Sequence, residues 1–308
     1  MKHRDEQKAT GTPASGGKKH RRRLPRWADR LITMLVILIG VGLMVWPWVL
    51  DRFEVSGVFN QISAVSSTVD ALPAEERERI LLQARAYNEL LAGESPELPA
   101  DEVEPYEEQL IFDRDPMMSW VEIPSINVSM PIYHGTGEEV LMAGVGHLEG
   151  TSLPVGGASS HCVLTAHSGM RNLSMFDDIH ALGEGDLVLL HTMNQTLAYK
   201  VASSEVVWPD EVESLAIEPG GDKLTLVTCT PYGVNDHRLL VHCDRTEYAE
   251  QEVAEQKSLL ARHWGKREVA VLVVAAAMAL ILLDIVIHRV RQRRGGGPAS
   301  GNRSGGGR

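Results

Sequence analysis

Three residues whose side chains together support acyl transfer stand at the ends of short apolar runs. Cys229 ends KLTLVTC, His167 ends HCVLTAH, and Arg238 begins RLLVHC. The thiolate is the reactive form of cysteine, and a nearby imidazolium or guanidinium raises its population. A histidine can protonate a departing amine and later take a proton from an incoming one, and an arginine can stabilise an oxyanion or hold a substrate backbone. If the three side chains meet, the set predicts acyl transfer through a thioester.

Taken singly, each of these residues has a plainer interpretation. His167 is one of twelve histidines, Arg238 has many acidic residues to pair with, and a lone cysteine is most often a small buried hydrophobe. The other two cysteines, Cys162 and Cys243, form no CxxC pair and are too few for a disulfide framework. We expect both to be buried thiols, with a disulfide between them as the alternative.

Other polar residues near the trio are candidates for binding or metal ligation. Four flank the proposed centre and are candidates for lining a substrate groove: Thr165, Thr228, Thr230 and Asn235. Three histidines and a cysteine would be the natural metal ligands, but their spacing is not that of a preformed site: His134, His147, His161 and Cys162. The acidic residues form no DxDxDG-like calcium loop. We therefore predict no metal site and no cofactor.

The elements that must bring the trio together are β-type runs, which begin at residue 120 and are separated by Gly, Pro and Asn. The runs are WVEIP, INVSMPIYHG, SHCVLTAH, LVLLHTM, TLAYKVASSEVV, KLTLVTC and RLLVHC. Short strands at this spacing favour a small closed or nearly closed β-barrel. Within KLTLVTC, alternation puts Cys229 on the face of Val227, and the turn-forming TPYG follows it. All three reactive residues would then lie at one rim.

Helical patterns precede and interrupt these runs. Residues 53–92 read as helix, with a segment opened by Pro73 and stopped by Gly93. One face of that segment is predicted to be apolar: Ile80, Ala84, Tyr87 and Leu91. Residues 94–110 are acidic, contain three prolines and lack an apolar period, so they read as loop rather than as a packed element. A short helix is expected within MFDDIHALGEGD, with an apolar face of Phe176, Ile179 and Leu182.

Two further apolar runs, 31–50 and 269–287, are long enough for transmembrane helices. The first lacks a small-residue cleavage site, so a retained anchor is favoured over a signal peptide. Residues 1–30 and 265–308 carry net charges of +7 and +6, whereas residues 51–264 carry −24. Because Lys and Arg stay on the cytoplasmic side, both termini are predicted to be cytoplasmic and the acidic segment extracytoplasmic. The basic tails contact the membrane in this interpretation, and without stacking aromatics they do not predict nucleic-acid binding.

At this point a resemblance becomes specific. TLVTC (225–229) followed by HRLLV (237–241) resembles the sortase signature, and TAHSG resembles the histidine motif of that family. WVEIPSINVSMPIYHGT, GVGHLEGTSLPVGG and LVTCTPYGVNDHRLLVHC extend the similarity to class C, pilin-polymerising sortases, over roughly residues 70–245.

The resemblance implies a mainly β fold, an eight-stranded sortase barrel with short helices and an N-terminal helical extension, flanked here by two transmembrane helices. It implies that Cys229 attacks the Thr–Gly bond of an LPxTG-like sorting signal, that His167 is the acid/base, and that Arg238 holds the oxyanion or orients substrate. Partners would be LPxTG-type pilin or surface proteins at the plasma membrane of a Gram-positive bacterium, with a pilin Lys amine as acceptor. The alternatives are a housekeeping sortase, which uses a peptidoglycan precursor, and a membrane-bound cysteine hydrolase.

The chain departs from the class C pattern in one respect. Residues 94–110 contain no DP-aromatic lid motif, and Asp115–Pro116 is followed by Met117 directly before a strand, so no lid residue is assigned. The predicted organisation is a basic tail (1–30), a transmembrane helix (31–50), a helical lead-in with acidic loop (51–118), a catalytic barrel (119–247), a juxtamembrane segment (248–268), a second transmembrane helix (269–287) and a Gly/Arg-rich tail (288–308).

Overall fold

The structure is a computed structural model of the chain, and it describes residues 60–112, 116–168, 175–231 and 233–258. A few single residues between 28 and 46 and residue 287 are also described, and each is helical. The chain forms two units, residues 1–47 and 48–308, and the fold and site described below belong to the second.

The predicted membrane spans, 31–50 and 269–287, fall largely outside the described residues, as do the two predicted tails. In the part of the chain that is described, no helix combines the length and the apolar character needed to cross a bilayer. The two spans therefore stay predictions.

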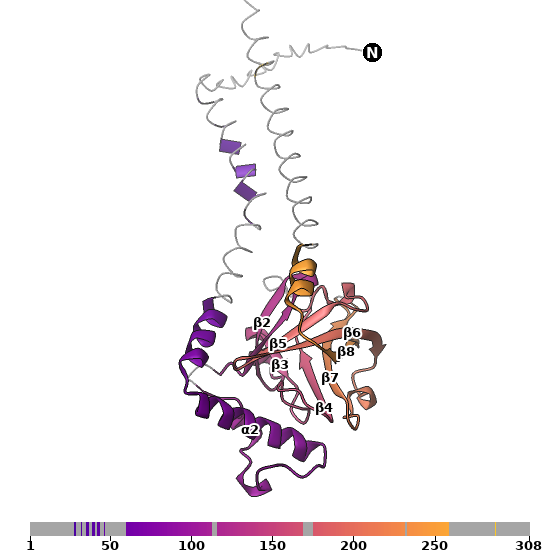
Figure 1. Cartoon of the computed structure of the whole chain (residues 1–308). Helices are drawn as coiled ribbons and strands as arrows, with labels where there is room; N and C mark the ends of the chain where they lie inside the picture. Colours follow the sequence, from indigo (N-terminus) through magenta and orange to yellow (C-terminus); the bar gives the residue numbers. More distant parts are fainter. Residues whose placement is uncertain are drawn as a thin grey trace, which may run out of the picture. The chain divides into compact units, whose positions relative to one another are not determined.

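Among the described residues, eight strands close into a β-barrel (Figure 1). Around the barrel their order is β1-β2-β3-β4-β7-β8-β6-β5. The pairs β2–β3 and β4–β7 are parallel and the others antiparallel. The strands are β1 Ser119–Ile123, β2 Val128–His134, β3 Val145–His147, β4 Ser160–Thr165, β5 Leu187–Thr192, β6 Gln195–Val207, β7 Asp222–Thr230 and β8 His237–Thr246. The predicted small closed barrel is confirmed. Seven of its strands coincide with the β-type runs of the sequence.

The strand that the sequence pattern did not predict is β3, Val145–His147. Three residues are too few to show a period of two, and the middle one is a glycine. Gly146 is required there by close approach, since a Cβ at this position would lie 2.4 Å from the carbonyl oxygen of Gly135. Glycine thus allows β3 to pack directly against the turn that follows β2.

Helical segments precede β1 and connect the strands. The segments are α2 Ala74–Leu91, η1 Ala100–Glu102, η2 Tyr106–Glu108, η3 Pro124–Ile126, α3 Glu138–Ala143, η4 Ile179–Ala181 and η5 Glu213–Leu215. The short helix expected within MFDDIHALGEGD is present as η4, and its predicted apolar face of Phe176, Ile179 and Leu182 is buried.

The N-terminal extension, residues 60–112, begins with helical residues 60–71 and α2, and it packs against the barrel (Figure 1). Ile80 and Ala84 are buried as predicted, but Leu91 is 36% exposed and so does not belong to the packed face. Its place is taken by a polar residue, Asn88, which is buried and bonds to both backbone groups of Leu153, with its amide donating at 3.1 Å and its oxygen accepting at 2.7 Å.

Residues 94–110 differ from the predicted unpacked loop. They include η1 and η2, and Tyr106, Gln109 and Leu110 are buried. The reason is a tertiary one, because the Tyr106 ring contacts the rings of both His134 and His147 of the barrel. Composition alone could not reveal those partners. The Asp115 of the Asp-Pro pair lies outside the described residues.

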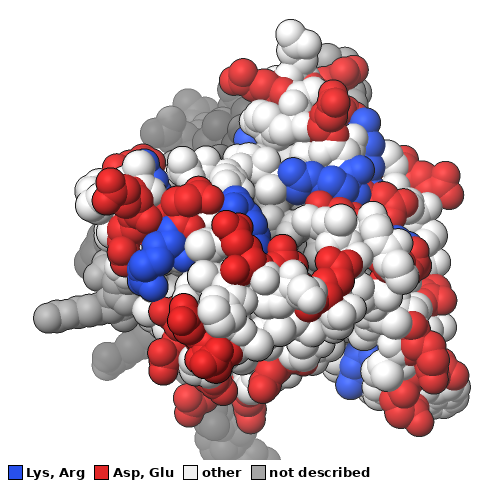
Figure 2. Space-filling model, turned by 60° about the horizontal axis from the view of Figure 1, so that its bottom comes forward, with Lys and Arg blue, Asp and Glu red and all other residues white. Residues whose placement is uncertain are grey.

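Strand β5 is buried on both of its faces. Val188 and Leu190 point into the main core, while Leu187 and Leu189 join Ala198 of β6 and Val253 in a second cluster. Val253 belongs to helical residues 250–258, which cover this outer side of the barrel. On the face that Figure 2 shows, acidic side chains are more abundant than basic ones.

Candidate active site

Two of the predicted catalytic residues face each other across one strand pair. Cys229 of β7 is the register partner of Arg238 of β8, one residue from the end of β7 and one residue into β8. On the other side of β8, Arg238 is paired with Val207, the last residue of β6. Directly opposed residues in an antiparallel pair have Cβ atoms about 5 Å apart. The thiol and the guanidinium therefore start from adjacent backbone positions.

His167 lies two residues beyond β4, and the end of β7 holds it there. The parallel β4–β7 pairing reaches Thr165 opposite Val227 and continues with a bond from the Ala166 N–H to the Val227 carbonyl at 3.2 Å. The Thr228 hydroxyl then donates to the Ala166 carbonyl, and the Ser168 hydroxyl donates to the Cys229 carbonyl, both at 2.8 Å. Bonds on both sides of His167 thus fix its backbone beside Cys229.

The three residues line a single pocket of about 400 Å³. Apolar side chains form most of its walls, and the other lining residues are Thr136, Leu141, Leu148, Val163, Thr165, Ala166, Val207, Trp208, Pro209, Glu211, Val212, Leu215, Val227 and Leu240. A half-buried thiol, an imidazole and a guanidinium in an apolar groove can bind an extended peptide and attack one of its carbonyl groups.

The three cysteines differ sharply in their surroundings. Cys229 is partly exposed, whereas Cys162 and Cys243 are buried and free, and burial raises the pKa of both buried thiols. The expected pair of buried thiols is confirmed. Cys162 and Cys243 are register partners of the same residue, Leu224, from opposite sides. They are therefore separated by two strand spacings, about 9.5 Å, which is too far for a disulfide.

Arg238 is held by its own turn. Its Nη1 donates to the carbonyls of Asn235 at 3.2 Å and His237 at 3.0 Å. Asn235 has φ 61°, a left-handed conformation that asparagine tolerates better than most residues. Next to the arginine, the ring of His237 packs against the Trp208 ring with centroids 4.1 Å apart. The start of β8 is thereby joined to the loop after β6.

Among the four polar candidates, Thr165 lines the pocket. Thr228 is buried on the opposite face of β7, where its hydroxyl supports the Ala166 carbonyl. Thr230 and Asn235 are not among the lining residues, and Asn235 contributes through its carbonyl bond to Arg238.

The histidines considered as metal ligands have other partners. His147 is fully buried and contacts Tyr106 and the Ser152 carbonyl. His161 Nε2 lies 2.7 Å from the Thr225 hydroxyl. The His134 ring bonds to the Gln109 carbonyl. Burial lowers the pKa of all three imidazoles, to about 4 in His147.

Comparison with known proteins shows where this fold and site occur together. A family model described as Sortase domain matches residues 121–246. Sortase A of Staphylococcus aureus is 30% identical over 216 residues, which cover 68% of this chain and 91% of that protein. The chain belongs to the sortase family. Sortases are cysteine transpeptidases, and the structural neighbours of this sortase are class C sortases.

Among those neighbours, a crystal structure of Streptococcus agalactiae sortase C1 is 40% identical, with a TM-score of 0.58, and the match covers 63% of this chain and 98% of that one. Sortase A of the same species is 27% identical over 149 residues, which make up 47% of this chain. This sortase spans 60% of the length of that curated relative.

Sequence reasoning missed the apolar walls of the sortase pocket. Part of the signal was present, because Val163 precedes Thr165 by two positions, Val227 precedes Cys229, and Leu240 follows Arg238, so that each shares a strand face with a predicted site residue. Trp208, Val212 and Leu215 come from the loop after β6, and no periodic pattern connects a loop with a distant strand end.

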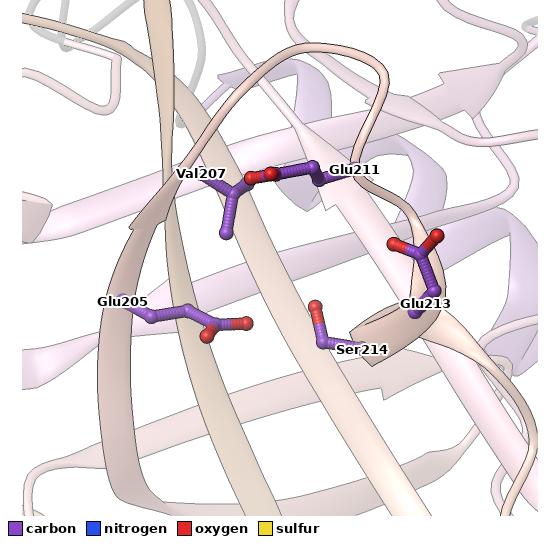
Figure 3. Close-up of a pocket in the computed structure, with 5 residues that line it drawn as sticks. All are labelled: Glu205, Val207, Glu211, Glu213 and Ser214. Atoms are coloured by element: carbon purple, nitrogen blue, oxygen red, sulfur yellow. The ribbon is translucent and has the colours of Figure 1, made fainter.

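A second pocket of about 410 Å³ adjoins the first and shares Val207 and Glu211 with it. Figure 3 shows three carboxylates, from Glu205, Glu211 and Glu213, together with Ser214 around this space. Bonds from Ser214 and His242 hold the pKa of Glu205 below its ordinary value. The residues that line this pocket include no cysteine and no histidine.

Proposed function

We propose that this sortase cleaves an LPxTG-like sorting signal between Thr and Gly and joins the new carboxyl end to a Lys amine of a pilin, which assembles a pilus. The observation that carries the proposal is that Cys229, His167 and Arg238 line one pocket of about 400 Å³. The pilin acceptor is supported by the class C neighbours, one of which is the sortase C1 of GBS Pilus Island 1, 41% identical to this chain.

In the first step, the Cys229 thiolate attacks the carbonyl carbon of the Thr residue. The oxyanion receives hydrogen bonds from the Arg238 guanidinium. When the Thr–Gly bond breaks, the Gly nitrogen takes a proton from His167 and leaves as an amine, so that a thioester remains on Cys229. In the second step, a Lys amine attacks the thioester carbonyl, its proton passes to His167, and the carbon–sulfur bond breaks to restore the thiolate.

Mass spectrometry of the purified full-length protein tests this proposal. After mixing with an LPxTG-type peptide, the wild type and Cys162→Ala should carry the cleaved peptide, whereas Cys229→Ala should not. Addition of a lysine-containing pilin fragment should move the peptide from Cys229 to a lysine side chain. No adduct on Cys229 would overturn the thioester mechanism, and transfer only to water or only to a peptidoglycan-precursor amine would overturn the pilin acceptor.

We further propose that the barrel lies outside the plasma membrane of a Gram-positive cell, between two membrane spans with both termini in the cytoplasm. The support is the net charge of −24 on residues 51–264 between two basic ends. A membrane-impermeant thiol reagent should label Cys229 in intact cells. Labelling that appears only after lysis would contradict this topology.

A further inference from the structure

One hydroxyl joins the N-terminal extension to the barrel at three points. The Tyr106 Oη lies 2.9 Å from His147 Nδ1, 3.1 Å from the His147 carbonyl oxygen and 2.9 Å from the Gly135 N–H. Tyr106 is 7% exposed, and His147 is fully buried. His147 is shielded from water and Gly135 is partly shielded, so His147 Nδ1 and the Gly135 N–H both gain a hydrogen-bond partner from this hydroxyl.

The protons in this network can be assigned. Burial lowers the pKa of His147 to about 4, so its imidazole is neutral at pH 7 and carries one N–H. Nε2 faces the Ser152 carbonyl at 2.9 Å, and a carbonyl only accepts, so Nε2 carries the proton. Nδ1 is then an acceptor, the Tyr106 O–H donates to it, and the Tyr106 oxygen accepts from the Gly135 N–H. Tyrosine is required for this arrangement, because phenylalanine supplies neither bond.

Gly135 is the point at which this network reaches the pocket of Cys229. Its neighbour Thr136 lines that pocket, and so does Leu141, six residues further along. From the opposite side, Gly135 is in close contact with Gly146 of β3, whose own neighbour in space is the Leu141 side chain. The backbone at Gly135 is therefore fixed by β3 on one side and by Tyr106 on the other.

We propose that Tyr106 is a positioning residue for substrate binding, which sets the Thr136–Leu141 wall of the pocket from outside the barrel. The inference rests on the proposed transpeptidase function, since it concerns how the sorting-signal peptide is held. The N-terminal extension then contributes to substrate specificity, because the Tyr106 hydroxyl determines the position of the Thr136–Leu141 wall. The reactive groups themselves are carried by β7, β8 and the end of β4.

Kinetics of Tyr106→Phe test the proposal in the full-length protein. The KM for an LPxTG-type peptide should rise about tenfold with kcat within a factor of about two, because a wall is loosened and the reactive groups are not moved. The alkylation rate of Cys229 by iodoacetamide should not change. Tyr87→Phe is the matched control, because its ring lies 6.2 Å from that of Tyr106 in the same extension, and it should leave KM unchanged.

A double variant shows whether the effect passes through the wall. If Tyr106 acts by placing Thr136, then Tyr106→Phe should raise KM much less in a Thr136→Ala background than in the wild type. An unchanged KM in Tyr106→Phe, or a parallel loss of kcat and of alkylation rate, would overturn the proposal. Absence of any peptide adduct in the wild type would instead overturn the transpeptidase function itself, so the two failures are distinguishable.

If Tyr106→Phe does not fold, as judged by circular dichroism, amide hydrogen exchange in Cys229→Ala provides the test. Binding of the peptide should slow exchange at the Gly135 amide, which donates to Tyr106, and leave Gly150 unaffected. Equal exchange at Gly135 with and without peptide would contradict a link between this bond and the occupied pocket.

Discussion

The three cysteines have the same side chain, and their environment decides which of them reacts. Cys229 is reachable from a pocket that also holds an imidazole and a guanidinium, whereas Cys162 and Cys243 lie in the barrel core. Thiolate formation is disfavoured in an apolar core, so only the pocket cysteine is placed for nucleophilic attack.

This contrast predicts selective alkylation. In the native protein at pH 7.5, iodoacetamide should modify Cys229 and leave Cys162 and Cys243 intact, because burial both shields the latter two and raises their pKa. Peptide mapping by mass spectrometry measures the modified sites, and unfolding in urea should expose all three. Modification of Cys162 or Cys243 at the rate of Cys229 in the folded protein would contradict the burial of these two thiols.

Arg238 is expected to act through its geometry as well as its charge. Arg238→Lys keeps the charge but replaces a planar fork of donors with a single ammonium, which cannot hold the turn carbonyls of Asn235 and His237 while contacting an oxyanion. We expect kcat/KM to fall about 100-fold.

The matched control for this change is Arg245→Lys on the same strand, where the guanidinium contacts Asp222 and the Tyr199 ring, away from the pocket. Peptide-cleavage kinetics should show a near-normal kcat/KM for this variant. An equal kcat/KM for Arg238→Lys and the wild type would show that the guanidinium is not required for the reaction.

At the scale of elements, the site depends on how far the parallel β4–β7 pairing extends. Where the backbone hydrogen bonds between β4 and β7 end, the Thr228 hydroxyl donates to the carbonyl of Ala166, the residue before His167. Thr228 is buried and supports the backbone before His167. Because it lies next to Cys229 in the sequence, the sequence pattern alone does not distinguish this structural role from a role in lining the substrate groove.

Thr228→Val tests this support. Valine has nearly the same shape, but it leaves the Ala166 carbonyl without the hydroxyl, so His167 should be placed less accurately and kcat/KM should fall about tenfold. Thr192→Val is the control, since the Thr192 hydroxyl likewise bonds a backbone carbonyl, that of Pro154, far from the pocket. If both variants lose only stability, measured by thermal unfolding, the positioning role is wrong.

Alternation and turn residues predicted the barrel and seven strands, because those signals are local. The same signals placed Cys229, His167 and Arg238 at strand ends, and the family resemblance assigned them roles. Local signals could not give the registers that oppose Cys229 to Arg238, the three-residue strand β3, or the packing of Tyr106 in an acidic, proline-rich segment. Each of those depends on partners distant in the chain.

At the scale of the whole molecule, the buried histidines make stability depend on pH. The pKa of His147 is lowered to about 4 in the folded protein, and burial also lowers those of His134 and His161. Between pH 6.5 and 4 the unfolded chain binds a proton at His147 that the folded protein does not, so acid favours unfolding in that range.

We therefore expect the free energy of unfolding to fall by about 2 kcal/mol between pH 7.5 and pH 5 from His147 alone. Urea unfolding at both values measures this fall, and it should be smaller in His147→Gln. The exposed His180 provides the control, because His180→Gln should keep the wild-type pH dependence. A fall of equal size in wild type and His147→Gln would show that His147 is not the group responsible.

The helix over residues 250–258 has a practical consequence for anyone who shortens this chain. Val253 covers Leu187, Leu189 and Ala198, and Gln256 bonds to the Leu187 N–H and the Gly185 carbonyl. Truncation directly after the last strand, at Thr246, would remove this helix and expose an apolar patch on the outside of the barrel. Such a patch favours self-association. A cut after Ser258 keeps this cover, so residues 250–258 should be retained with the barrel.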